Sequence, residues 1–106
     1  STSKLYFNNN EFILNEVNII LLDEILSSDS VEIIKYNFYI KGFASNSGNE
    51  SYNKILSTKR SQAVYNYLIS KGIAAEAIKS ESFGVDFAEK NESKARRVEI
   101  EISKTL

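Results

Sequence analysis

The sequence predicts an α+β fold in the order β-α-β-α-β-β, a two-layer sandwich with the helices packed on one face of a mixed sheet. Segments whose apolar residues recur every three or four positions, the spacing of a helix, lie between segments that alternate apolar and polar residues, the spacing of a half-buried strand. The chain has 106 residues, of which 42% are hydrophobic and 25% charged. These values are typical of a globular protein with one core, so we expect a single domain over residues 1–106.

The first half of the chain predicts strand, helix and strand. Residues 5–7 read as a short first strand, followed by a polar turn at residues 8–10. Apolar residues at helical spacing predict a helix over residues 13–26. Strict alternation over residues 34–41 predicts a long half-buried strand that ends at Gly42.

The second half predicts helix, strand and strand. Residues 43–51 are small and polar and read as a loop, and the next helix covers residues 52–71, with Gly72 as its C-cap residue. A weaker strand follows at residues 78–83, and the polar stretch after it has room for one helical turn. Residues 97–102 alternate most cleanly and predict the last strand.

Absent residue types exclude several classes of site. The chain has no Cys and no His, so zinc sites, disulfides, cysteine nucleophiles and histidine triads are excluded. A carboxylate metal site stays possible, but no EF-hand spacing is present, and we expect neither a metal nor a cofactor. A net charge of −1 argues against nucleic acid as a partner. No apolar stretch approaches the ~18 residues of a membrane span.

One catalytic motif occurs, and we attribute it to chance. Residues 51–54 and 1–4 both fit S-x-x-K, the signature of serine acyl-enzymes. In a chain with 15 Ser and 10 Lys such matches are expected, and the accompanying K-T-G element is missing. We therefore expect that the protein is not an enzyme.

Arg60 is the first candidate binding residue. The chain uses lysine ten times and arginine three times, and arginine is preferred where a planar fork must bind a carboxylate. Its spacing from Leu56 places Arg60 on or beside the apolar stripe of its helix, where a guanidinium needs an acceptor. Two interpretations stay open: an internal partner such as Glu99 or Asp86, or an anion-binding site beside the 43–51 loop.

Arg96 and Arg97 precede the last strand. Because adjacent strand residues face opposite ways, only one of the two can point at a common site. For the other, and for either one taken by itself, a solvated edge charge is the simpler interpretation.

Taken together, these segments resemble the C-terminal OmpA-like domain family. The family pattern reads approximately G-H-[TA]-D-x-x-G, then Y-N-x-x-L-S-x-x-R-A-x-x-V-x-x-Y-L, and closes with N-R-R-V-E-I. Here residues 42–48 read GFASNSG, residues 52–68 read YNKILSTKRSQAVYNYL and residues 95–100 read ARRVEI. Residues 82–84, SFG, stand where the family has G-Y-G, so the match covers nearly the whole chain in order.

The resemblance implies a non-covalent peptidoglycan anchor in the cell envelope of Gram-negative bacteria. Members lie in the periplasm, usually as the tail of a barrel, a lipoprotein or a motor stator. We therefore expect the C-terminal part of a longer envelope protein, tethered to the outer membrane by a segment outside this chain. The expected partner is peptidoglycan with a diaminopimelate-type stem peptide, and other envelope proteins are further candidates.

The resemblance also assigns ligand-binding positions. The family's arginine in L-S-x-x-R takes a carboxylate of the ligand, and the aspartate of G-H-T-D pairs with its ammonium group. The positions carried over are Arg60, Ser45, Ala44, Asn53, Leu56, Ser57 and Arg97. Ser45 stands at the aspartate position, and a neutral hydroxyl cannot neutralise an ammonium. We expect Ser45 to lie at a solvated loop position. We expect Arg60 to be partly accessible, facing a cavity between the 43–51 loop and the segment after Phe83.

Loss of the aspartate leaves two functions open. A charge-assisted hydrogen bond contributes roughly 1.5–3 kcal/mol, so its loss weakens binding by about ten- to a hundredfold. The domain is then a peptidoglycan anchor of reduced affinity. The alternative is an OmpA-like fold that has lost glycan binding and acts as a protein-interaction or structural module of the envelope.

Overall fold

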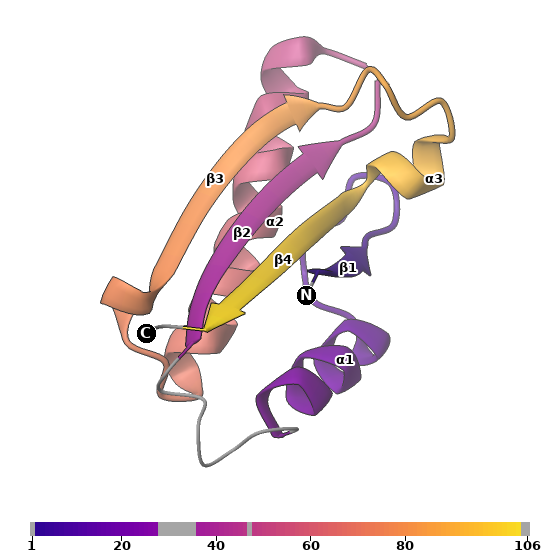
Figure 1. The fold of residues 1–106 in the computed structure, drawn as a ribbon. Helices are drawn as coiled ribbons and strands as arrows, with labels where there is room; N and C mark the ends of the chain where they lie inside the picture. Colours follow the sequence, from indigo (N-terminus) through magenta and orange to yellow (C-terminus); the bar gives the residue numbers. More distant parts are fainter. Residues whose placement is uncertain (1, 28–35, 47, 105–106) are drawn as a thin grey trace.

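The computed structural model describes residues 2–27, 36–46 and 48–104. Its centre is a four-stranded mixed sheet in the order β1-β4-β2-β3 (Figure 1). The strands are β1 (Thr2–Tyr6), β2 (Tyr36–Ala44), β3 (Ile78–Val85) and β4 (Arg97–Lys104). β4 pairs antiparallel with both β1 and β2, whereas β2 and β3 are parallel. The predicted α+β class and mixed sheet are therefore confirmed.

The helices lie between the strands in the chain. They are α1 (Glu16–Ser27), α2 (Glu50–Ser70), the 3-10 turn η2 (Ala75–Ala77) and the short α3 (Glu92–Ala95). Figure 1 shows α2 running along one face of the sheet and α1 lying beyond the β1 edge. Within the described ranges, no helix has both the length and the apolar character that a membrane crossing requires.

The core forms between the sheet and the inner sides of α1 and α2. Inward-facing residues of β2 and β4 meet two positions of α2 that are separated by one helical turn. The residues at its centre are Phe38, Ile40, Val98, Ile100, Val64, Leu68, Leu22 and Leu5. Each is at most 1% exposed, so this cluster supplies the hydrophobic stabilisation of the domain.

Several boundaries differ from the prediction. The first strand begins at Thr2 and ends before Phe7, and β2 and β3 each run two residues further than expected, to Ala44 and Val85. Residues 34 and 35 of the predicted strand lie outside the described residues.

Capping side chains set where both long helices begin. Asn15 accepts a hydrogen bond from the backbone N–H of Asn18 at 2.9 Å, so α1 begins at Glu16 rather than at residue 13. Asn49 accepts one from the N–H of Tyr52 at 3.1 Å, so α2 begins two residues earlier than predicted. Gly72, just after α2, has a φ of +94° and terminates the helix as expected.

Gly42 does not end β2 but lies inside it, where α2 crosses the strand. A Cβ at this position would lie 2.3 Å from the backbone carbonyl oxygen of Ser57 and 3.0 Å from the Cβ of Ser61. The absence of a side chain therefore allows the close contact between α2 and β2. Because α2 packs this closely on β2, the inward-facing residues of the helix lie directly against the sheet.

We predict that Gly42→Ala destabilises the domain by about 1–3 kcal/mol, because the methyl group overlaps backbone that belongs to another element. Urea unfolding followed by circular dichroism measures the change. The control is Asn37→Ala, an exposed position on the same strand, which should stay within ~0.5 kcal/mol. An equally small effect at Gly42 would contradict the close packing.

Candidate functional site

The site residues expected from α2 lie on one side of that helix. Asn53, Leu56, Ser57 and Arg60 are spaced three or four residues apart and all face inward. They are joined by Ala44 and Ser45 at the end of β2. All seven expected positions, Arg97 included, are buried.

Arg60 is enclosed by backbone carbonyls. Its Nε donates to the carbonyl of Glu11 at 2.8 Å, and Nη2 donates to that of Asn8 at 3.1 Å. Its Nη1 donates to the carbonyl of Phe43 at 3.3 Å. The guanidinium also lies 5.4 Å from the centre of the Phe7 ring. The β1–α1 loop, residues 7–15, thus covers the arginine from the side opposite the sheet.

Arg60 has no carboxylate as an ion-pair partner among the described residues. Burial disfavours its charged form, and the nearby positive charge of Arg96 adds to this, so the pKa of Arg60 falls to about 10. The guanidinium still carries its charge at neutral pH. The site therefore holds a cation that makes three hydrogen bonds to neutral carbonyls and that no described carboxylate neutralises.

The expectation of a partly accessible Arg60 was wrong, and its internal partners are backbone carbonyls rather than the carboxylates named as examples. Its exposure is 0%, so the arginine is not partly accessible and does not face a cavity after Phe83. Nor does it pair with Glu99 or Asp86. Both carboxylates bind Arg97 instead, because the last strand directs Arg97 to the other face of the sheet.

Arg97 forms a separate, internally satisfied cluster. Its Nη2 lies 2.8 Å from Asp86 and its Nε 2.7 Å from Glu99, and its guanidinium lies 4.1 Å from the centre of the Phe43 ring. Its neighbour Val98 points into the core beneath α2, so Arg97 points away from Arg60. The structure therefore does not bring Arg97 and Arg60 together, and Arg97 is not a solvated edge charge.

Arg96 is the arginine on the Arg60 side, which sequence reasoning did not select. Its Nε donates to the carbonyl of Phe7 at 3.0 Å, on the residue whose ring lies beside Arg60. The alternation of side chains along the last strand could have predicted the side on which Arg96 lies. Val98 is apolar and inward, so residue 96, two positions earlier, shares its side of the strand.

Two expected positions of α2 differ in their hydrogen bonding. The hydroxyl of Ser57 accepts from the N–H of Gly84 at 3.1 Å and donates to the carbonyl of Lys54, which fixes α2 to the end of β3. The Nδ2 group of Asn53 is buried and has no hydrogen-bond partner among the described residues. Asn53 is thus an amide with capacity left for a ligand.

Ser45 was expected at a solvated position, and that expectation was wrong. Its exposure is 3%, so the residue that directly follows β2 is buried. A charge introduced there would be largely removed from water.

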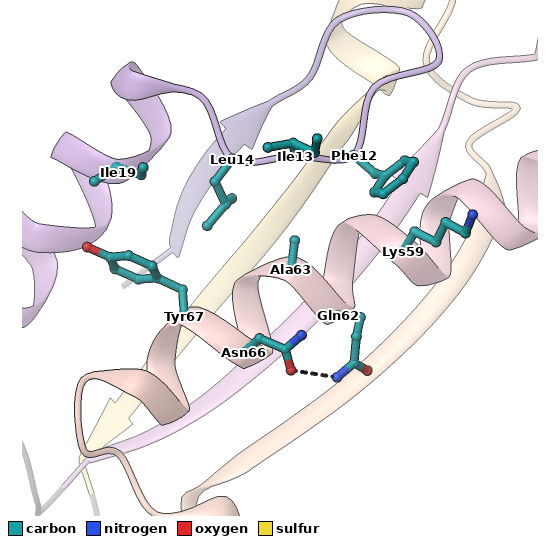
Figure 2. A pocket seen from close by; sticks show the side chains of 9 residues that line it. All are labelled: Phe12, Ile13, Leu14, Ile19, Lys59, Gln62, Ala63, Asn66 and Tyr67. Carbon is teal, nitrogen blue, oxygen red and sulfur yellow. Dashed lines mark hydrogen bonds between the residues drawn. The ribbon is translucent and has the colours of Figure 1, made fainter.

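A hollow of about 590 Å³ lies on the outer side of α2, between this helix, residues 12–14 and α1. Figure 2 shows Phe12, Ile13 and Leu14 facing Ala63 across it. Its walls are mainly apolar, and two of its polar groups engage each other, since Gln62 donates to Asn66 at 2.8 Å. Lys59, at one end, lies over the Phe12 ring. No expected binding residue lines this hollow.

Metal chemistry finds no support in the described part of the chain, where no group of three or more Asp and Glu side chains is arranged to hold an ion. The geometry instead offers the buried cation Arg60, the second cation Arg96 beside it, and the Asn53 amide, whose Nδ2 has no partner in the described ranges.

Comparison with known proteins places this geometry in a family. The model of the OmpA family matches residues 6–101 of the chain. The chain belongs to the OmpA family. It is 34% identical over 83 residues to outer membrane protein A of Salmonella typhi and 32% identical over 83 residues to that of Escherichia coli O157:H7. Each alignment covers 77% of this chain and 24% of the relative, so the chain spans about a quarter of these proteins.

Solved OmpA-like structures share the fold. The peptidoglycan-associated lipoprotein from Burkholderia pseudomallei superimposes with a TM-score of 0.76 at 22% identity, over 94% of this chain and 89% of that one. The OmpA-like domain of FopA1 from Francisella tularensis gives 0.80 at 23% identity, over 97% and 72%. The periplasmic domain of Helicobacter pylori MotB gives 0.77 at 18% identity, over 99% and 76%.

The Arg97 cluster of this OmpA-family domain predicts a pH-dependent stability. Burial alone raises the pKa of Asp86, but the hydrogen bond and charge of Arg97 outweigh it and hold the pKa below its usual range. The ion pair therefore stabilises the fold fully above the unfolded carboxyl pKa of ~3.9, and this contribution is lost as the pH falls through the lower folded value.

We predict that Asp86→Asn lowers the free energy of unfolding by about 1–3 kcal/mol at pH 7. The difference from wild type should shrink below about pH 4. Urea titrations across this range measure both effects, and Glu76→Gln, at an exposed position with no ion pair to a described residue, provides the carboxylate control. A difference that persists unchanged to about pH 2 would contradict the assignment.

Proposed function

We propose that the domain attaches non-covalently to peptidoglycan, and that Arg60 binds a carboxylate of the diamino acid in the stem peptide. The observation that carries the proposal is the buried guanidinium without an acidic partner among the described residues. A carboxylate would neutralise the positive charge, which the backbone carbonyls cannot do, and the planar guanidinium can hold a carboxylate through two parallel bonds. The Nδ2 group of Asn53 is a further donor for the ligand.

The names of the relatives, which are proteins of the bacterial envelope, support this proposal. One solved neighbour is a peptidoglycan-associated lipoprotein, another is the periplasmic domain of MotB, and the curated relatives are outer membrane proteins. We infer that this chain acts in the periplasm as the C-terminal part of a longer envelope protein tethered to the outer membrane.

Binding at Arg60 requires the β1–α1 loop to move. The carbonyls of Asn8 and Glu11 occupy two of its donor groups, and the ligand carboxylate would replace them. Asn8 and Glu11 are both exposed. The turn between them is held by a hydrogen bond that the N–H of Glu11 donates to the carbonyl of Asn8. Local opening of a loop with so few buried contacts costs far less than global unfolding.

One observation favours a second function. Because three backbone carbonyls already saturate much of the guanidinium, Arg60 also fits a purely structural role. The domain would then be a structural or protein-interaction module of the envelope that has lost glycan binding.

Sedimentation with purified sacculi separates the two functions. Under the first, the domain co-sediments, free diaminopimelate competes, and Arg60→Lys weakens binding by at least about tenfold, because lysine keeps the charge but loses the planar fork. Lys59→Ala is the matched control at the adjacent residue, which lies over Phe12 rather than inside the site. A folded wild-type domain that stays in the supernatant would establish the second function.

Ser45 limits the affinity in the first function, since it offers no negative charge to the ammonium of the diamino acid. We predict that Ser45→Asp raises the affinity for free diaminopimelate by about ten- to a hundredfold. Because Ser45 is buried, the new carboxylate should also lower stability in the free protein, by about 1–3 kcal/mol.

Calorimetric titration and urea unfolding measure these two changes. The control is Ser45→Asn, because asparagine has the size of aspartate but no charge. It should leave the affinity within about threefold of wild type. No gain for Ser45→Asp, with the fold intact, would show that this position does not face the ligand's ammonium.

A further inference from the structure

A second hollow, of about 300 Å³, opens on the other side of the loop that covers Arg60. It lies between β1, the start of α1 and α3. None of its described lining residues is acidic, whereas two are basic, Lys4 and Arg96. Asn15 and Ser93 add uncharged polar groups to its wall. A hollow with two cations and no carboxylate favours an anionic guest.

Arg96 still has donors to offer. Its Nε is occupied by the Phe7 carbonyl at 3.0 Å, but its two terminal nitrogens make no hydrogen bond with a described residue, and it forms no ion pair with one. Its side chain is half-buried, which limits the screening of its charge by water. The free edge of the guanidinium has the geometry that binds a carboxylate through two parallel bonds.

Lys4 is likewise available. Its cross-strand neighbour in the β1–β4 pair is Glu99, which is engaged by Arg97 at 2.7 Å. No ion pair joins Lys4 to a described residue.

The hollow and the Arg60 site share their dividing wall. The carbonyl of Asn8 accepts from Arg60, and Asn8 also lines the hollow. Phe7 contacts both arginines, through its ring and through its carbonyl. The positive charge of Arg96 also contributes to lowering the pKa of Arg60, after burial, in keeping with this shared wall. A ligand with two carboxylates close together could therefore reach both.

We propose that Arg96, assisted by Lys4, is a second carboxylate subsite, which binds the free α-carboxylate of the glutamate that precedes the diamino acid in the stem peptide. This proposal rests on the proposed function, because Arg60 holds the diamino acid itself. The stem peptide links glutamate through its γ-carboxyl group, which leaves the α-carboxylate free next to the diamino acid. Amidation to isoglutamine removes that charge with little change in size.

Calorimetric titration with two synthetic tripeptides tests the subsite. The probes are L-Ala-γ-D-Glu-meso-diaminopimelate and the same peptide with the glutamate α-carboxylate amidated. We expect the acid form to bind about tenfold more tightly than the amide form, the effect of one charge-assisted bond. Arg96→Gln should abolish this preference by weakening only the acid form, and Lys4→Gln should reduce it by about threefold.

Two further variants provide controls. Lys90→Gln removes an exposed cation outside the hollow and should leave both affinities unchanged. Arg96→Lys keeps the charge and should retain part of the preference, which separates loss of charge from a disturbed loop.

The outcomes distinguish the two proposals. If both peptides bind equally in a manner that depends on Arg60 but not on Arg96, the subsite is wrong and the proposed function stands. If neither peptide binds to the folded wild-type domain, both are overturned. A preference for the acid form that disappears in Arg96→Gln alone establishes the subsite.

Discussion

The guanidinium of Arg60 connects parts of the chain that are distant in sequence, and the architecture of the site depends on its burial. It binds carbonyls of Asn8 and Glu11 from the β1–α1 loop and of Phe43 from β2, while its own backbone belongs to α2. Burying a charge without a counter-charge is costly. The three hydrogen bonds and the adjacent hydrophobic core offset that cost, and the unmet demand for negative charge makes the site suitable for a carboxylate ligand.

Close packing of α2 on β2 is what places Arg60 there. Gly42 lets the backbone of Ser57 approach the strand, and one turn further along the helix Arg60 reaches under the covering loop. Ser57 fixes the same helix to Gly84. Two glycines and a serine, none of which carries a charge, thus help to determine the position of Arg60.

The consecutive arginines Arg96 and Arg97 differ in their surroundings: Arg97 is neutralised inside the fold, whereas Arg96 is the residue of the proposed second subsite. Strand alternation sends Arg97 to the open face of the sheet, where Asp86 and Glu99 neutralise it. Arg96 lies beside the loop, and its two terminal nitrogens bond to no described residue. The hollow in Figure 2 stands apart from both, since it presents apolar walls and polar side chains that bind each other. The two arginines on which the proposed recognition of carboxylates rests, Arg60 and Arg96, therefore lie at the β1 side of α2.

The sequence by itself determined the elements and their order, because hydrophobic periodicity reflects which side of each helix or strand must be buried. It also placed Arg60 on or beside the apolar stripe of α2, although the sequence led us to expect a partly accessible side chain and the structure buries it. Tertiary structure alone decided what surrounds it. The covering carbonyls of Asn8 and Glu11 come from about fifty residues away, and backbone acceptors leave no trace in side-chain chemistry. The burial of Ser45 and the ion pairs of Arg97 likewise depend on how the end of the sheet packs. Spacing along one strand gives the direction of a side chain, but its partners are set by contacts between segments that no local pattern encodes.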